Sequence, residues 1–116
     1  DAVEIRTYAL EALHVASEQG DISVAALHLY TLLRLDLAQG RPERSARLFG
    51  AVEAICRARR VSFPPLGQER AETVRERLEE ALGSERLAVE LAVGRGLSQE
   101  QAVAVAGDAD IRQAGR

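Results

Sequence analysis

Apolar residues recur every three or four positions along most of the chain, which is the spacing of one face of an α-helix. The first such stretch runs from Ala2 to Gln19, and Gly20 then offers a position at which a helix can end. Asp21 can cap the start of a second helix that continues to Gln39. The pattern therefore predicts a pair of helices joined by a short turn.

The second predicted helix is apolar around nearly its whole circumference, with leucine and alanine at most positions between 24 and 38. A helix of this kind must be buried on most sides. We therefore expect it to lie at the centre of the domain. Only a narrow strip remains for water or a polar partner, and it carries His28, Thr31, Asp36 and Gln39.

Four further helices follow from the same reasoning. Gly40 ends the second helix, and Pro42 is a favoured first-turn residue for a third helix, which runs to about Arg60. Pro64 and Pro65 prevent that helix from continuing. The remaining helices are expected at about 68–82, at 84–94 and, after a capping box at Ser98–Gln101, up to about 106.

The sequence thus predicts an all-α domain of about six helices over residues 1–106, followed by a frayed or disordered tail at 107–116. The third helix has an inward-facing stripe, and Phe49 is its largest member. On the first helix, Ile5, Ala9 and Leu13 are expected to cover the second helix.

Composition supports a single helical domain, because apolar residues make up 47% of the 116 residues while aromatic residues make up only 3%. The 18 acidic and 15 basic residues are interspersed, so no positive electrostatic field attracts nucleic acid.

No run of apolar residues is long enough to span a bilayer. The lone Cys56 is compatible with a reducing cytoplasm. Because the chain lacks methionine, we expect it to be part of a longer protein.

Residues 26–57 resemble one tetratricopeptide (TPR) repeat, a helical hairpin of about 34 residues. Leu32 matches the large position of its first helix, and Ser45 and Phe49 match the small and aromatic positions of its second helix. Asp36 stands where the family usually has an aromatic residue, and Val52 stands where it usually has alanine.

A wider resemblance covers roughly residues 20–106. The segments LDLAQGRPERSARLFGA (35–51), Pro64–Pro65 and GLSQEQAV (96–103) resemble the C-terminal helical region of large bacterial regulators that have an ATP-binding module, including LuxR-type regulators. The resemblance implies antiparallel hairpins stacked as a right-handed superhelix. It also implies a non-catalytic, cytoplasmic scaffold that binds a protein partner or other domains of its parent chain.

The candidate chemistry of the chain does not favour an enzyme, a metal site or a cofactor. His14, His28 and Cys56 fall on three different predicted helices without the local spacing of a zinc site. Cys56 also lies on an apolar stripe, which favours a buried structural thiol. The glutamates between 72 and 80 alternate with arginines, a pattern typical of a solvated helix face. No phosphate-binding glycine loop is present.

Three sets of residues remain as candidate contacts. The polar strip of the second helix would bind a partner in a surface groove, and the alternative is that it contacts solvent alone. The rival function for the chain is a sensor with a pocket for a small ligand. Arg57, Arg59 and Arg60 either complement a helix C-terminus or bind an acidic partner. An open apolar face on the first helix would produce a two-fold dimer. That face contains Tyr8, Ala12 and Val15.

Overall fold

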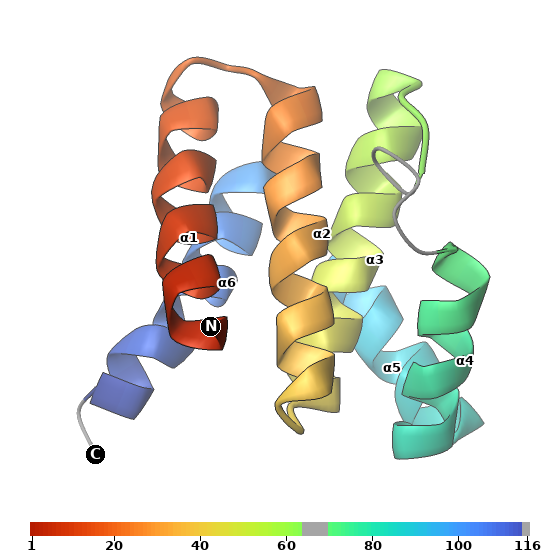
Figure 1. The fold of residues 1–116 in the computed structure, drawn as a ribbon. Helices are drawn as coiled ribbons and strands as arrows, with labels where there is room; N and C mark the ends of the chain where they lie inside the picture. Colours follow the sequence, from red (N-terminus) through yellow and green to blue (C-terminus); the bar gives the residue numbers. More distant parts are fainter. Residues whose placement is uncertain (64–69, 115–116) are drawn as a thin grey trace.

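The protein is all α-helical over the residues that the computed structural model describes, which are 1–63 and 70–114, and these contain no strand. The all-α fold expected from the sequence is therefore confirmed (Figure 1). The described residues form six helices, which are α1 (Ala2–Glu18), α2 (Ile22–Ala38), α3 (Pro42–Arg59), α4 (Ala71–Leu82), α5 (Ser84–Arg95) and α6 (Gln99–Ala114).

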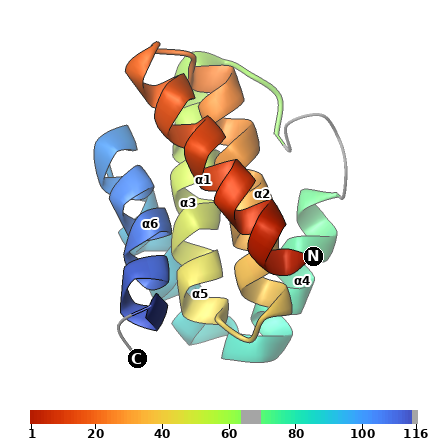
Figure 2. The ribbon, with the colours of Figure 1, turned by 60° about the vertical axis from the view of Figure 1, so that its left-hand side comes forward.

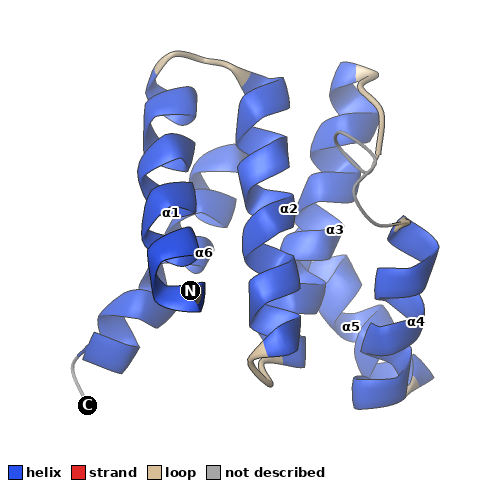
Figure 3. Cartoon of the chain, viewed as in Figure 1, coloured by secondary structure: helices blue, strands red, loops and turns tan. Residues whose placement is uncertain are grey.

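Local sequence signals set most of the helix ends. The Asp21 carboxylate accepts a hydrogen bond from the backbone N–H of Val24 (3.1 Å) and so caps the start of α2. Gly20 and Gly40 adopt left-handed φ angles of 71° and 79°, which end α1 and α2 at little steric cost. The tight turns that result hold α1, α2 and α3 antiparallel and side by side, as Figure 3 shows.

The capping box before α6 is also present. The Ser98 hydroxyl accepts from the backbone N–H of Gln101 (3.1 Å), and the Gln101 side chain accepts from the backbone N–H of Ser98 (2.8 Å). The helix does not end near Ala106 as expected but continues to Ala114. The expected proline break at Pro64–Pro65 and the start of a helix near Gln68 lie outside the described residues.

The last helix packs back against the first three. α6 contacts α1, α2 and α3, and Figure 2 shows it running beside α3. The side-chain amide of Gln99 donates to the Ser17 hydroxyl at 3.5 Å, which links the two ends of the fold. In a purely open stack of hairpins each unit would contact only its neighbours. The return of α6 closes the bundle on one side.

The helix at the centre is α3, not α2 as the apolar pattern had indicated. α3 packs against α2, α4, α5 and α6, whereas Leu27, Leu35 and Leu37 of α2 keep part of their surface exposed. The reason is the size of the residues on α3. Gly50 and Ala46 are small and buried, so other helices can approach its backbone closely.

The closest helix approach is the crossing of α3 and α5 at two glycines. A Cβ atom added to Gly94 would overlap the carbonyl oxygen of Arg47, and one added to Gly50 would overlap that of Leu91. Neither glycine has a positive φ. Glycine is therefore required here by space, and not by backbone conformation.

Replacing Gly94 by Ala is expected to lower the free energy of unfolding by about 1 to 3 kcal/mol, because the added methyl group must push α5 away from α3. Gly107→Ala in α6 is the matched control, since nothing lies within 4 Å of the added atom. It should raise stability by about 0.5 to 1 kcal/mol, as expected for Gly→Ala inside a helix. Urea unfolding of both variants tests this, and equal changes in the two would contradict a close contact at Gly94.

An ion-pair cluster lies beside this crossing. Glu90 of α5 is 3% exposed and pairs with Arg47 of α3 (Nε–Oε1 2.8 Å) and with Arg86 (Nε–Oε2 3.1 Å). The hydrogen bond from Arg47 lowers the pKa of the Glu90 carboxyl, and the bond from Arg86 adds to this effect, although burial opposes it. The ionised carboxylate therefore stabilises the contact between α3 and α5.

Glu90→Gln is expected to lower stability at pH 7 by about 1.5 to 3 kcal/mol, the usual worth of hydrogen bonds to a charged group. Because the folded pKa of Glu90 is lowered, its contribution is complete above the unfolded pKa of about 4.3 and is lost as the pH falls through the folded value. The stabilities of wild type and variant in denaturant unfolding should thus approach each other as the pH falls below the unfolded pKa and through the lowered folded pKa. A stability difference between wild type and Glu90→Gln that stays constant with pH would contradict this role. An equal loss of stability in the control Glu72→Gln, at an exposed position, would also contradict it.

Candidate partner-binding surface

The polar strip expected on α2 does not form one surface. Asp36 has 0% exposure, so it cannot contact a partner, and its placement on a solvent-facing strip was wrong. Gln39 is exposed, but its side-chain oxygen accepts a hydrogen bond from Arg6 of α1 (3.0 Å). The two residues therefore belong to a network that joins α2 to Arg6 of α1.

The other two strip residues face different surroundings. The His28 ring lies edge-on to the ring of Tyr8 at 6.2 Å between centroids, and partial burial lowers the pKa of this imidazole. The Thr31 hydroxyl donates to the backbone carbonyl of Leu27 (3.2 Å). His28 is thus tied to α1, while Thr31 lines a separate groove.

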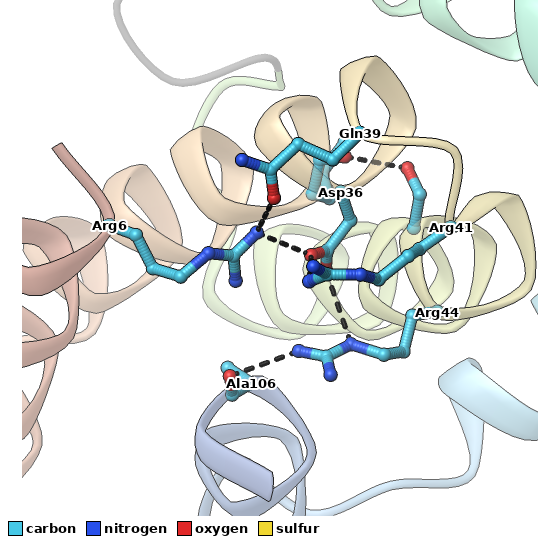
Figure 4. A network of polar contacts seen from close by, with 8 residues as sticks. Arg6, Asp36, Gln39, Arg41, Arg44 and Ala106 are labelled. Carbon is cyan, nitrogen blue, oxygen red and sulfur yellow. Dashed lines mark hydrogen bonds and ion pairs between the residues drawn. The ribbon is translucent and has the colours of Figure 1, made fainter. Parts of the chain in front are cut away.

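Asp36 is buried because three arginines surround its carboxylate (Figure 4). Arg6 donates to Oδ1 at 2.7 Å, Nε of Arg44 lies 3.3 Å from Oδ2, and Nη1 of Arg41 lies 3.6 Å from Oδ1. Arg44 also donates to the carbonyl of Ala106 in α6 (3.0 Å). The cluster therefore joins α1, α2, α3 and α6, and its role is to hold these helices together.

The burial of Arg6 also changes the orientation expected for α1. Ala9 and Leu13 face the core as expected, but Ile5 is 48% exposed and Arg6 is only 5% exposed. The pairing of Arg6 with Asp36 explains the difference, because the charge is neutralised inside the bundle. Sequence spacing alone gives no sign of this contact, since 30 residues separate the partners.

The largest exposed apolar side chains gather mainly on α1. Tyr8 is 69% exposed and Val15 is 52% exposed, although both are large enough to belong in a core. Together with Val24 of α2 they border an open hollow of about 440 Å³, here named the α1–α2 groove. Its lining is Tyr8, Glu11, Ala12, Val15, Ala16, Gln19, Asp21 and Val24. The three residues that the sequence put forward for self-association thus lie on one surface.

A second groove, of about 330 Å³, lies between α2, α4 and the start of α1. Arg34 and Arg77 flank it, and the Arg34 guanidinium also lies 5.9 Å from the centroid of the Tyr30 ring. Apart from Thr31, the rest of its lining is apolar and consists of Ile5, Leu35 and Ala38. We call it the α2–α4 groove.

The arginines at the end of α3 are all exposed. Arg57 and Arg59 fall in the last turn of the helix, where cations complement the helix dipole. Arg60 follows in the left-handed conformation (φ 56°), and its backbone N–H bonds to the carbonyl of Arg57 (3.4 Å). Their position at a helix C-terminus is confirmed, whereas contact with an acidic partner stays a prediction.

Cys56 is buried as the sequence predicted, with 3% exposure, and this burial raises the pKa of its thiol. The described parts of the chain contain no group of three or more side chains that could hold a metal ion. In the same parts, no helix combines the length and the hydropathy that crossing a bilayer requires.

Comparison of the chain with family models, with curated proteins and with solved structures finds no match.

Proposed function

We propose that this chain is a non-catalytic protein–protein interaction module of a larger bacterial transcriptional or signalling regulator, and that it binds through the α1–α2 groove. The observation that carries the proposal is the set of exposed apolar side chains on α1. Tyr8 and Val15, which line the groove, are 69% and 52% exposed, and Val24 of α2 lines it beside them. Exposed apolar side chains gathered on one surface typically mark a contact with another protein.

The groove has the features of a protein-binding surface. Tyr8 offers an aromatic ring at its border, and tyrosine is among the residues that contribute most to binding energy. Ala12 and Ala16 are small and line the same groove, so a partner can approach the backbone of α1. The surrounding helices are fixed by buried contacts, which limits the entropy lost on binding.

The resemblance to helical-repeat regions supports this proposal, because such helices commonly serve as scaffolds. The partner is then a separate protein or another domain of the parent chain, in the cytoplasm. Neither nucleic acid nor a membrane is part of the proposal.

The alternative function, a sensor of small ligands, would use the α2–α4 groove. Arg34 and Arg77 beside the apolar Leu35 and Ala38 form a lining that suits a small anionic ligand. A thermal-shift screen separates the two functions, since a ligand that binds the folded state raises the melting temperature. Stabilisation by small anions that is lost in Arg34→Ala would favour the sensor.

Photo-crosslinking tests the interaction module directly. A benzophenone amino acid would replace Tyr8 in the full-length natural protein, with the same residue at the exposed Thr73 of α4 as control. We expect a specific adduct, either to another protein or to another segment of the parent chain, from position 8 and not from position 73. Absence of any adduct at position 8 would contradict the proposal.

A further inference from the structure

The α1–α2 groove has an acidic border. Glu11 and Asp21 line it directly. Glu4 and Glu18 lie seven residues before and after Glu11, which places all three glutamates along one side of α1 because seven residues make nearly two helical turns. All of these carboxylates are exposed.

Little positive charge offsets this border. Residues 1–30 contain five acidic residues and only one basic residue, Arg6. The Arg6 side chain is 5% exposed and is paired with Asp36, so it adds almost nothing to the potential outside. The apolar strip of Tyr8, Ala12 and Val15 is therefore next to a row of negative charge.

We propose that the occupant of the α1–α2 groove is an amphipathic α-helix with an apolar stripe and basic side chains along one edge of that stripe. The stripe would bury Tyr8 and Val15, and its lysines or arginines would face Glu4, Glu11 and Glu18. This inference rests on the proposed function of the groove and specifies the chemistry of the partner.

The shape of the groove favours a helix. Its walls are α1 and the first turn of α2, and side-chain ridges of a third helix can pack between two neighbouring helices. Ala12 and Ala16 are four residues apart, so they form a shallow channel that such a ridge can enter. A helix also satisfies its own backbone hydrogen bonds when it docks on an apolar surface.

The charge argues against a second copy of this chain as the occupant. A two-fold contact centred on the groove places the acidic border of both copies in one interface. The carboxylates of Glu4, Glu11 and Glu18 would then be present twice with little positive charge to offset them, and like charges close together are unfavourable. A basic helix gains from the same carboxylates that repel a second copy.

A displayed helix library tests the proposal. Each member is about as long as α1, has apolar residues at one fixed helical stripe, and has either Lys, Glu, Ser or Ala at every flanking position. Selection with the wild-type chain is compared with selection by a Tyr8→Glu, Val15→Glu variant. That variant is more acidic but lacks the apolar surface, so it controls for attraction by charge alone.

We expect the wild type to enrich helices with Lys over Glu along one edge by about tenfold, the size expected of two or three exposed ion pairs. The Tyr8→Glu, Val15→Glu variant should enrich no helix of the library. In Glu11→Arg the preference for Lys should weaken or reverse at the flanking positions nearest to residue 11.

Three results would overturn the proposal. These are no enriched helix, enrichment without preference for Lys, and enrichment that is equal in the double variant. Self-association of the wild type through this face in sedimentation equilibrium would also overturn it, by showing that a second copy is the occupant. If the library fails while crosslinking from position 8 succeeds, the interaction function stands and only the basic helix is wrong.

Discussion

Replacing Asp36 by Asn is expected to lower the free energy of unfolding by about 3 to 5 kcal/mol, the cost of removing one partner from a buried ion pair. The carboxylate of Asp36 has 0% side-chain exposure and is the shared partner of Arg6, Arg41 and Arg44. Burial already lowers the pKa of the Arg44 guanidinium, and the Asp36 carboxylate opposes this shift. An amide at position 36 would leave this buried positive charge without its counter-ion.

Asp21→Asn is the matched control for this experiment. It makes the same chemical change on the same helix, but at an exposed N-cap, where asparagine caps about as well as aspartate. Denaturant unfolding should therefore show a change close to zero. A loss below about 1 kcal/mol for Asp36→Asn would show that the cluster is not a stabilising junction.

A double-mutant cycle can separate the arginines. If Arg6 acts through Asp36, then Arg6→Met together with Asp36→Asn should cost less than the sum of the two single changes. Additive losses would mean that Arg6 stabilises α1 independently of Asp36.

Replacing Phe49 by Ala is expected to lower stability by about 3 to 5 kcal/mol, because truncating a buried ring leaves a cavity. Phe49 is 1% exposed. Its ring lies edge-on to that of Phe63 at 5.2 Å, and Phe63 in turn contacts Tyr30 at 5.7 Å. The change therefore removes both buried area and an aromatic contact.

Thermal and denaturant melts followed by circular dichroism measure this effect. Phe49→Leu is the conservative control, and it should restore about half of the loss because it refills much of the cavity. A loss below about 1 kcal/mol for Phe49→Ala would contradict the burial of this ring between the helices.

The helix boundaries could be predicted because short-range signals determine them. Gly20, Asp21, Gly40 and Pro42 act within one turn of their own position, and the structure places α1, α2 and α3 where these residues indicated. The continuation of α6 past Ala106 was not predicted, because residues 107–116 were expected to form a frayed or disordered tail. Nothing lies within 4 Å of the position of a Cβ at Gly107, so the helix passes through it without obstruction.

The central position of α3 depends on contacts between distant residues. Its close approach to α5 requires glycine at positions 50 and 94, where each faces the backbone of the opposite helix. In the sequence, a glycine at a helix crossing cannot be told from a glycine in a turn. The sequence indicated α2 as the central helix because α2 is apolar around nearly its whole circumference. Apolar content, however, does not show which helix its neighbours can approach most closely. Small residues at matching positions on two helices are the signal that predicts such a crossing.

The candidate surface was predictable only in part. Tyr8 and Val15 share a helical face in the sequence, and the structure leaves both exposed. Asp36 was expected on the surface because it shares the polar strip of α2 with His28, Thr31 and Gln39. Arg41 and Arg44 follow closely in the sequence and could have indicated a local ion pair, whereas Arg6 could not.

The central claim is that a partner covers the α1–α2 groove, and hydroxyl-radical footprinting of the two tyrosines tests it most directly. In the isolated chain Tyr8 should be oxidised rapidly and Tyr30 slowly, because their exposures are 69% and 1%. In the full-length natural protein, purified with whatever it binds, we predict that Tyr8 becomes protected while Tyr30 is unchanged. Equally rapid oxidation of Tyr8 in both samples would contradict the claim.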